Sequence, residues 1–178
     1  SQLHWNSGSG HWSRIWLRMR PGTWLVWAVN LYGEDRHTET AKGGDDSILD
    51  EIILGTWDRS FTNMGKRILK NFTDSTRNLQ GHPLDRLLVR MNHENNQSNY
   101  YRIYESTRVK YKNAMERAIL KIRDGLGTNW AKVKFMHAPS HGPYIGTYES
   151  WCPSNIDVLC VSVHPGKQVT NGTEASQY

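Results

Sequence analysis

The apolar residues near the start of the chain fall into two short runs that predict neighbouring strands. Residues 13–20 and 23–31 both have strand-like composition, and Pro21-Gly22 between them is a typical turn signal. The second run contains Trp24-Leu-Val-Trp-Ala-Val, which is almost continuously apolar, as in a central strand. We therefore expect a hairpin whose second strand buries Trp24 in the sheet.

Helical periodicity appears in three later segments. Residues 46–54 place four branched apolar side chains on one face, and residues 61–72 form a second, weaker helical pattern. The clearest pattern covers residues 107–124, where the following Gly125 is a common helix terminator. We expect Met115 and Ile122, in the apolar stripe of this last helix, to face the sheet.

Strand-like segments surround the last helix. Residues 84–91 and 100–105 flank the polar stretch 93–99 and predict a second hairpin, while 131–136 and 157–163 follow the helix. Paired strands interrupted by helices are typical of an α+β domain with a largely antiparallel sheet and helices packed on one face.

Length and polarity suggest a single domain with a short tail. The 178 residues suit one core, which we place over residues 1–165, and the polar residues 166–178 predict a flexible tail. No apolar run approaches the ~20 residues that a membrane span needs, and no signal peptide is visible. We expect no membrane partner. The two cysteines suggest reduced thiols and a cytoplasmic or nuclear location.

The most unusual composition occurs in residues 136–153. Three prolines and two glycines fix the backbone there, while two histidines, two tyrosines and a tryptophan are available for contacts. We expect a rigid turn in which Tyr144 or Tyr148 packs against the sheet. His137 and His141 are expected at the rim of the same cleft as Arg90.

Several short motifs resemble those of a known fold. Gly22-Thr-Trp-Leu-Val-Trp and Tyr101-Arg-Ile-Tyr-Glu-Ser-Thr are similar to two strands of the cap-binding translation initiation factor 4E. Pro143-Tyr-Ile-Gly-Thr-Tyr and the Cys-Pro that follows resemble the basophilic leukaemia-expressed protein family, which has the same fold. The resemblance covers roughly residues 15–155 and implies a curved antiparallel sheet. The acidic residue that reads a cap has no counterpart after Trp12 or Trp16, so cap recognition is not implied.

Basic and aromatic side chains provide the candidate ligand contacts. Alternation along the first strand would place Arg and Trp side chains on one face, where rings could stack on bases and guanidinium groups could pair with phosphate. In the resembling fold the second hairpin supplies phosphate contacts and an aromatic near the base. The ligand-binding candidates are Trp12, Arg14, Trp16, Arg18, Arg90, His93, Tyr101, Tyr104, His137 and His141.

These residues, with a net charge of +5, predict a non-enzymatic domain that binds RNA or a nucleotide. A protein-interaction module that binds a partner peptide is the first alternative. A His-dependent nuclease or phosphodiesterase is the second, since histidine titrates near neutrality. Phosphate-binding loops, dinucleotide fingerprints and zinc-ligand spacings are absent from the sequence. We therefore expect no cofactor, no metal and no catalytic residue.

Overall fold

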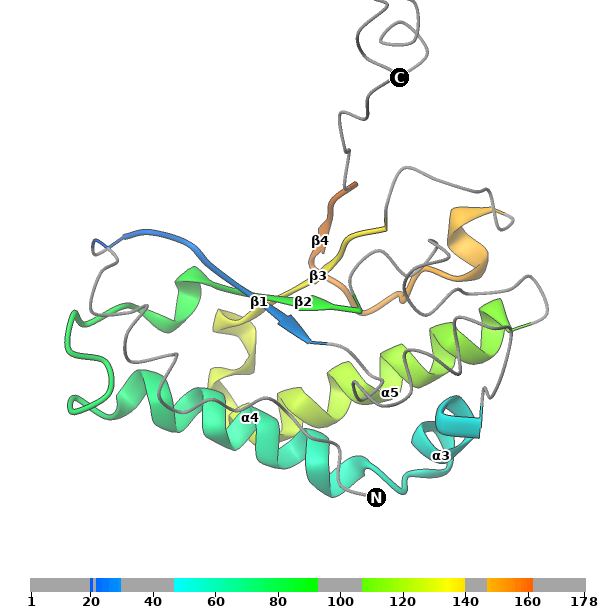
Figure 1. Cartoon of the computed structure of the whole chain (residues 1–178), viewed down its shortest axis with the longest axis horizontal. Coiled ribbons are helices and arrows are strands. Elements are labelled where there is room, and N and C mark those ends of the chain that lie inside the picture. Colours follow the sequence, from blue (N-terminus) through cyan, green and yellow to red (C-terminus); the bar gives the residue numbers. More distant parts are fainter. Residues whose placement is uncertain (1–19, 21, 30–46, 93–106, 140–146, 162–178) are drawn as a thin grey trace, which may run out of the picture.

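The computed structural model describes residues 20, 22–29, 47–92, 107–139 and 147–161 (Figure 1). The described strands form one four-stranded sheet in the order β1-β2-β3-β4. The strands are β1 (Leu25–Val29), β2 (Leu87–Met91), β3 (Lys134–His137) and β4 (Val158–Leu159). Every neighbouring pair is parallel, with Leu25 opposite Leu87 and Met91 opposite His137.

The prediction of an α+β domain with a largely antiparallel sheet is therefore wrong, because all the described strand pairs are parallel. The curved antiparallel sheet implied by the resemblance to initiation factor 4E is wrong for the same reason. The turn itself is present, because Thr23 N donates to Arg20 O over 3.1 Å and Gly22 has a φ of +88°. However, β1 pairs with β2, which follows two helices, and parallel pairs require such a crossover. The expected hairpin partners 13–19 and 100–105 lie outside the described residues.

The helices agree closely with the sequence patterns. They are α3 (Ser47–Leu54), α4 (Asp58–Thr73) and α5 (Arg108–Leu126), with short 3-10 turns η2 (Leu84–Arg86), η3 (Gly127–Lys132) and η4 (Tyr148–Ser150). The three predicted helices are confirmed within a few residues. The two expected strands on either side of α5 begin late, because η2 and η3 occupy their first residues.

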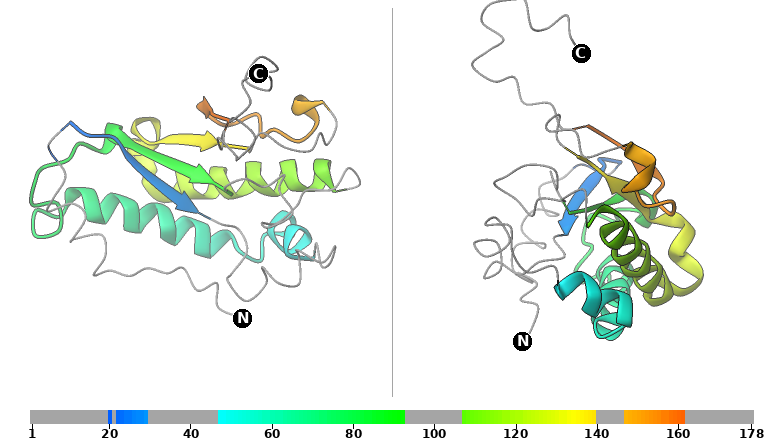
Figure 2. Two further views of the ribbon diagram at one scale, coloured as in Figure 1. Left: turned by 45° about the horizontal axis from the view of Figure 1, so that its top comes forward. Right: turned by 90° about the vertical axis from the view of Figure 1, so that its right-hand side faces the viewer.

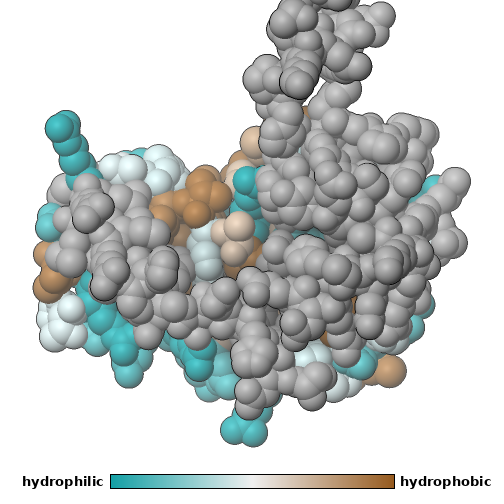
Figure 3. Space-filling model, viewed as in Figure 1, coloured by the Kyte–Doolittle hydropathy of each residue, from teal (hydrophilic) through white to brown (hydrophobic). Residues whose placement is uncertain are grey.

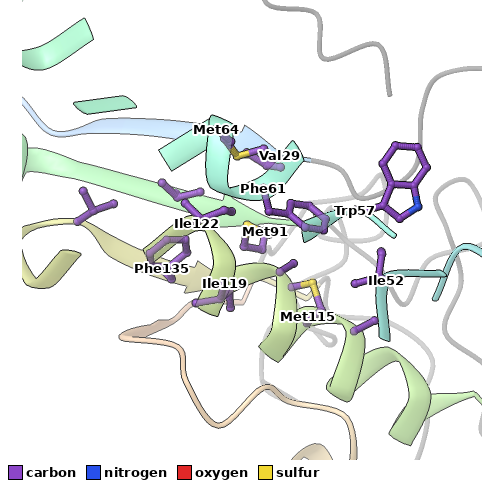
Figure 4. Packing of buried hydrophobic residues seen from close by; sticks show 14 of the residues in the cluster. Val29, Ile52, Trp57, Phe61, Met64, Met91, Met115, Ile119, Ile122 and Phe135 are labelled. Atoms are coloured by element: carbon purple, nitrogen blue, oxygen red, sulfur yellow. The ribbon is translucent and has the colours of Figure 1, made fainter. Parts of the chain in front are cut away.

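All three α-helices lie on the same face of the sheet (Figures 1 and 2). A sequential strand order places the connecting helices on one face when the crossovers share the same hand. Alternate strand residues point to the helices, where Phe61, Met115, Ile122 and Phe135 pack among the buried side chains (Figure 4). The expected burial of Met115 and Ile122 is confirmed.

Trp24 does not join this core, contrary to the prediction. It lies just before β1, on the face turned away from the helices, and 46% of its surface is exposed. The adjacent Leu25 and Trp27 have the opposite orientation and pack against the core. An almost continuously apolar strand does not reveal which alternate set is buried, and that ambiguity explains the error.

Two close contacts tie α4 to α5. Gly65 and Gly125 meet where the helices cross, so their backbones approach without intervening side chains. Near the start of α4, Arg117 of α5 donates two hydrogen bonds to Asp58 at 2.8 and 2.7 Å. These contacts fix α5 beneath the sheet and therefore fix the position of its first turn.

Candidate functional site

The carboxyl ends of the four strands lie along one edge of the sheet, because all of the strands are parallel. In open α/β sheets, ligands generally bind at this edge where the strand order reverses. The described order β1-β2-β3-β4 is sequential and contains no such reversal, so the side chains along the edge must indicate where a ligand would bind. Backbone hydrogen bonds tie its neighbouring segments together. Asn92 N donates to Val29 O over 2.6 Å, and Cys160 N donates to His137 O over 3.0 Å.

Asn92 directly follows β2 at this edge and has a φ of 51°. Among the described residues, it is the sole non-glycine residue with positive φ. Asparagine tolerates this left-handed conformation better than most residues, and such conformations are enriched at functional sites. The side chain is buried. Asn92 thus turns the chain sharply at the end of an inner strand.

His137 ends β3 and is completely buried. Its Nδ1 lies 2.7 Å from the Tyr148 hydroxyl, and its ring contacts the Trp151 ring nearly edge-on, with centroids 5.3 Å apart. Burial lowers the His137 pKa to about 4, so the imidazole is neutral near pH 7. His137 therefore positions Tyr148 from within the buried side chains at this edge of the sheet. The sequence had suggested that His137 is an exposed ligand contact at the rim of a cleft.

Tyr148 and Cys152 remain protonated in the same cluster. Burial raises the pKa of the Tyr148 hydroxyl and also the pKa of the Cys152 thiol. Neither group is activated as a nucleophile, since nucleophilic cysteines need a lowered pKa. The packing of Tyr148 against the sheet, one of the two options expected for residues 136–153, is confirmed by its contacts with His137 and Trp151.

The first turns of α5 bring positive charge to the same edge. Arg108, Lys110 and Lys112 occupy alternate positions at its start, and the first turn contains no acidic residue. Tyr111 packs against His137 with ring centroids 6.2 Å apart, and Lys112 Nζ donates to Glu149 O over 3.1 Å. These contacts place the N-terminus of α5 beside β3 and η4.

This charge arrangement favours an anion. A helix N-terminus carries a partial positive charge and unpaired backbone N–H groups, so acidic side chains are the usual residues there. The Nζ atom of Lys110 lies 3.0 Å from Oδ2 of Asp50 in α3, and this ion pair neutralises part of the positive charge at the start of α5. The remaining basic character resembles that of helix N-termini that bind phosphate.

The structure separates the two candidate contacts that it describes. Arg90 lies opposite Ala28 and Met136, half-buried on the sheet face away from the helices. His137 points to the helix face, so the two residues do not share a cleft. The other candidates lie outside the described residues: Trp12, Arg14, Trp16, Arg18, His93, Tyr101, Tyr104 and His141.

Sequence reasoning missed the basic start of α5, although a signal was present. Residues 107–124 were predicted to form a helix, and Arg108-Val-Lys-Tyr-Lys at its start lacks the acidic residues expected there. The left-handed turn at Asn92 had no comparable signal, because the other asparagines that the structure describes do not adopt this conformation.

No metal centre or membrane-spanning helix was found in the part of the chain that the structure describes. There, no three His, Cys, Asp or Glu side chains gather as metal ligands. None of the described helices is both long and apolar enough to cross a membrane. Family models, curated proteins and solved structures gave no match to this chain.

Proposed function

We propose that the protein binds a small phosphorylated ligand of the nucleotide class at the carboxyl edge of the parallel sheet. The observation that carries the proposal is the basic N-terminus of α5, which the Tyr111–His137 contact holds beside the end of β3. The nucleotide ligand predicted from the sequence is retained, while the proposed site moves away from the Arg14–Trp16–Arg18 face.

Electrostatics supports an anionic ligand at this place. Each cation near a helix N-terminus costs roughly 0.3–1 kcal/mol, the reverse of the gain that an anion brings there. Arg108 and Lys112 add to the helix dipole at the α5 N-terminus. A phosphate group between them would offset this repulsion and accept hydrogen bonds from the first backbone N–H groups.

The buried cluster below the edge supports the rigidity that such a site needs. His137 is neutral and holds the Tyr148 hydroxyl, and Trp151 packs against both rings. A neutral imidazole adds no further positive charge, so the basic residues of α5 set the local potential. In this proposal His137 is a positioning residue. His93 lies outside the described residues, and its role as a ligand contact stays a prediction from the sequence.

Calorimetric titration of the full chain tests the proposal with ADP, inorganic phosphate and adenosine. We expect ADP to bind and adenosine to bind at least tenfold more weakly, because phosphate contacts dominate. Arg108→Gln and Lys112→Gln should each weaken ADP by about 1.5–3 kcal/mol, the typical contribution of a charged hydrogen bond.

Lys66→Gln is the matched control, since Lys66 is an exposed lysine on α4. It removes the same charge from the chain and should leave ADP affinity unchanged. Equal affinities for ADP and adenosine would contradict a phosphate site. Equal losses in the Lys66 and Lys112 variants would show that net charge, and not the α5 N-terminus, determines binding.

A further inference from the structure

The face of the sheet away from the helices forms a second, separate surface. Its positions on β1 are Val26 and Ala28, preceded by Trp24, because Leu25 and Trp27 point to the core. The strand register places Leu88, Arg90, Lys134 and Met136 on the same face. We call this surface the open face, and an apolar patch is visible over β1 in Figure 3.

Exposure of the β1 part of this face is unusual for a parallel sheet, whereas Met136 of β3 on the same face is buried. Parallel sheets are normally covered on both faces by their crossover helices. Here the described helices cover one face, while Trp24 is 46% and Val26 48% exposed on the other. Large exposed apolar surface commonly marks an interaction site.

The charged residues of the open face determine the kind of partner. On β1, β2 and β3, the charged residues at the positions of this face are Arg90 and Lys134, and both are basic. Arg86 lies beside them, with its guanidinium carbon 5.1 Å from the centre of the Trp24 ring. This surface combines apolar and aromatic side chains with charged side chains that are all basic. It is therefore complementary to a polyanion that carries flat apolar groups.

We infer that the open face binds single-stranded RNA. An unpaired base would stack on the face of the Trp24 ring that Arg86 does not cover. Arg86, directly before β2, and Lys134 of β3 would contact phosphates. Stacking needs an accessible base face, which a duplex hides, and RNA is the nucleic acid recognised mainly in its single-stranded regions. This inference is independent of the proposed phosphate site, because it uses the opposite face of the sheet.

Fluorescence anisotropy of the full chain tests the inference with a labelled single-stranded RNA, the matching duplex and the same sequence as DNA. We expect the single-stranded RNA to bind most tightly and its affinity to fall as salt rises. Trp24→Ala should weaken RNA binding about 5- to 150-fold, the effect of losing one stacked base. Trp24→Phe should retain most of the affinity.

Trp130→Ala is the matched control. Trp130 is 48% exposed and also lies against an arginine, with the Arg123 guanidinium carbon 5.3 Å from its ring centre, but it belongs to η3. This variant should bind RNA like the parent. Equal losses for Trp24→Ala and Trp130→Ala would overturn the inference.

Two charge variants examine the basic side chains of the face, and Arg86→Gln also removes the guanidinium that lies over the Trp24 ring. Arg86→Gln and Lys134→Gln should each reduce the slope of log affinity against log salt by about 0.7, the value for one phosphate contact on a single strand. Arg108→Gln should leave RNA affinity unchanged, so a failed phosphate site and a failed RNA face give different results. Unchanged slopes, or equal affinity for duplex or DNA, would overturn the inference.

Discussion

Gly65 of α4 and Gly125 of α5 are in direct contact where the two helices cross. A Cβ atom on Gly65 would lie 2.9 Å from the Gly125 Cα, and a Cβ atom on Gly125 would lie 3.0 Å from the Gly65 Cα. The nearest neighbours are backbone atoms, which cannot rotate away as a flexible side chain could. The helix pair therefore depends on the absence of side chains at both positions.

We expect Gly65→Ala to destabilise the protein by at least about 1–3 kcal/mol, the usual cost of overpacking. The intrinsic helix preference of alanine would act in the opposite direction by only ~1 kcal/mol. Urea unfolding followed by circular dichroism measures the difference. Asn63→Ala, at an exposed position of the same helix, should change stability by less than about 0.5 kcal/mol. A Gly65 variant as stable as this control would contradict the close crossing.

Phe135 and Trp24 should differ greatly in their contribution to stability. Phe135 is fully buried in β3, whereas Trp24 is half-exposed on the open face. Phe135→Ala should cost about 3–5 kcal/mol through lost burial and a cavity. Trp24→Ala should cost about 1 kcal/mol, near the centre of the distribution for point substitutions. If thermal unfolding showed equal losses of stability for the two variants, Trp24 would be buried, as the sequence suggested.

Met115→Asp should unfold the domain or strongly destabilise it. Met115 is completely buried on α5, so the variant would place a carboxylate among apolar side chains. The neighbouring Asn113 is exposed on the same helix, and Asn113→Asp provides a matched acidic substitution. Far-ultraviolet circular dichroism of both variants would measure the effect. Equal melting temperatures would mean that the assigned face of α5 is incorrect.

Acid should destabilise the protein through His137. Its pKa is about 4 when folded and roughly 6.5 when unfolded, so the unfolded state binds more protons between these values. The free energy of unfolding should therefore fall as pH decreases from ~6.5 to ~4, by up to about 3 kcal/mol from this residue. Urea unfolding at several pH values measures this dependence.

His137→Gln removes the titrating group while retaining a polar side chain. Its free energy of unfolding should depend less on pH over the same interval, and it should be less stable at neutral pH because the contact with Tyr148 changes. If the parent and the variant show parallel pH profiles, the imidazole does not titrate as a buried neutral group.

The helices were predictable because their information is local. The apolar spacing over residues 107–124 correctly indicated which face of α5 is buried, including Met115 and Ile122. Strand direction is not local information. Pro21-Gly22 favours a turn equally before a hairpin or before a crossover, and only the pairing of β1 with β2 distinguishes them.

The candidate site was predictable only in part for the same reason. The basic residues at the start of α5 could be recognised in the sequence, but their placement beside β3 depends on the Tyr111–His137 contact. The composition of residues 136–153 suggested accessible histidines. Burial of His137 under Tyr148 and Trp151 depends on the direction of β3, which the sequence pattern did not indicate.

The parallel pairing of β1 with β2 also determines when the sheet can assemble during synthesis. Residues 25–29 leave the ribosome well before residues 87–91, so β1 has no β2 to pair with until α3 and α4 have been made. Closing so long a loop is entropically costly before the contacts form, which slows parallel sheets. Until then Val26 and its neighbours are an unpaired apolar segment of the nascent chain, and mistakes in folding should begin there.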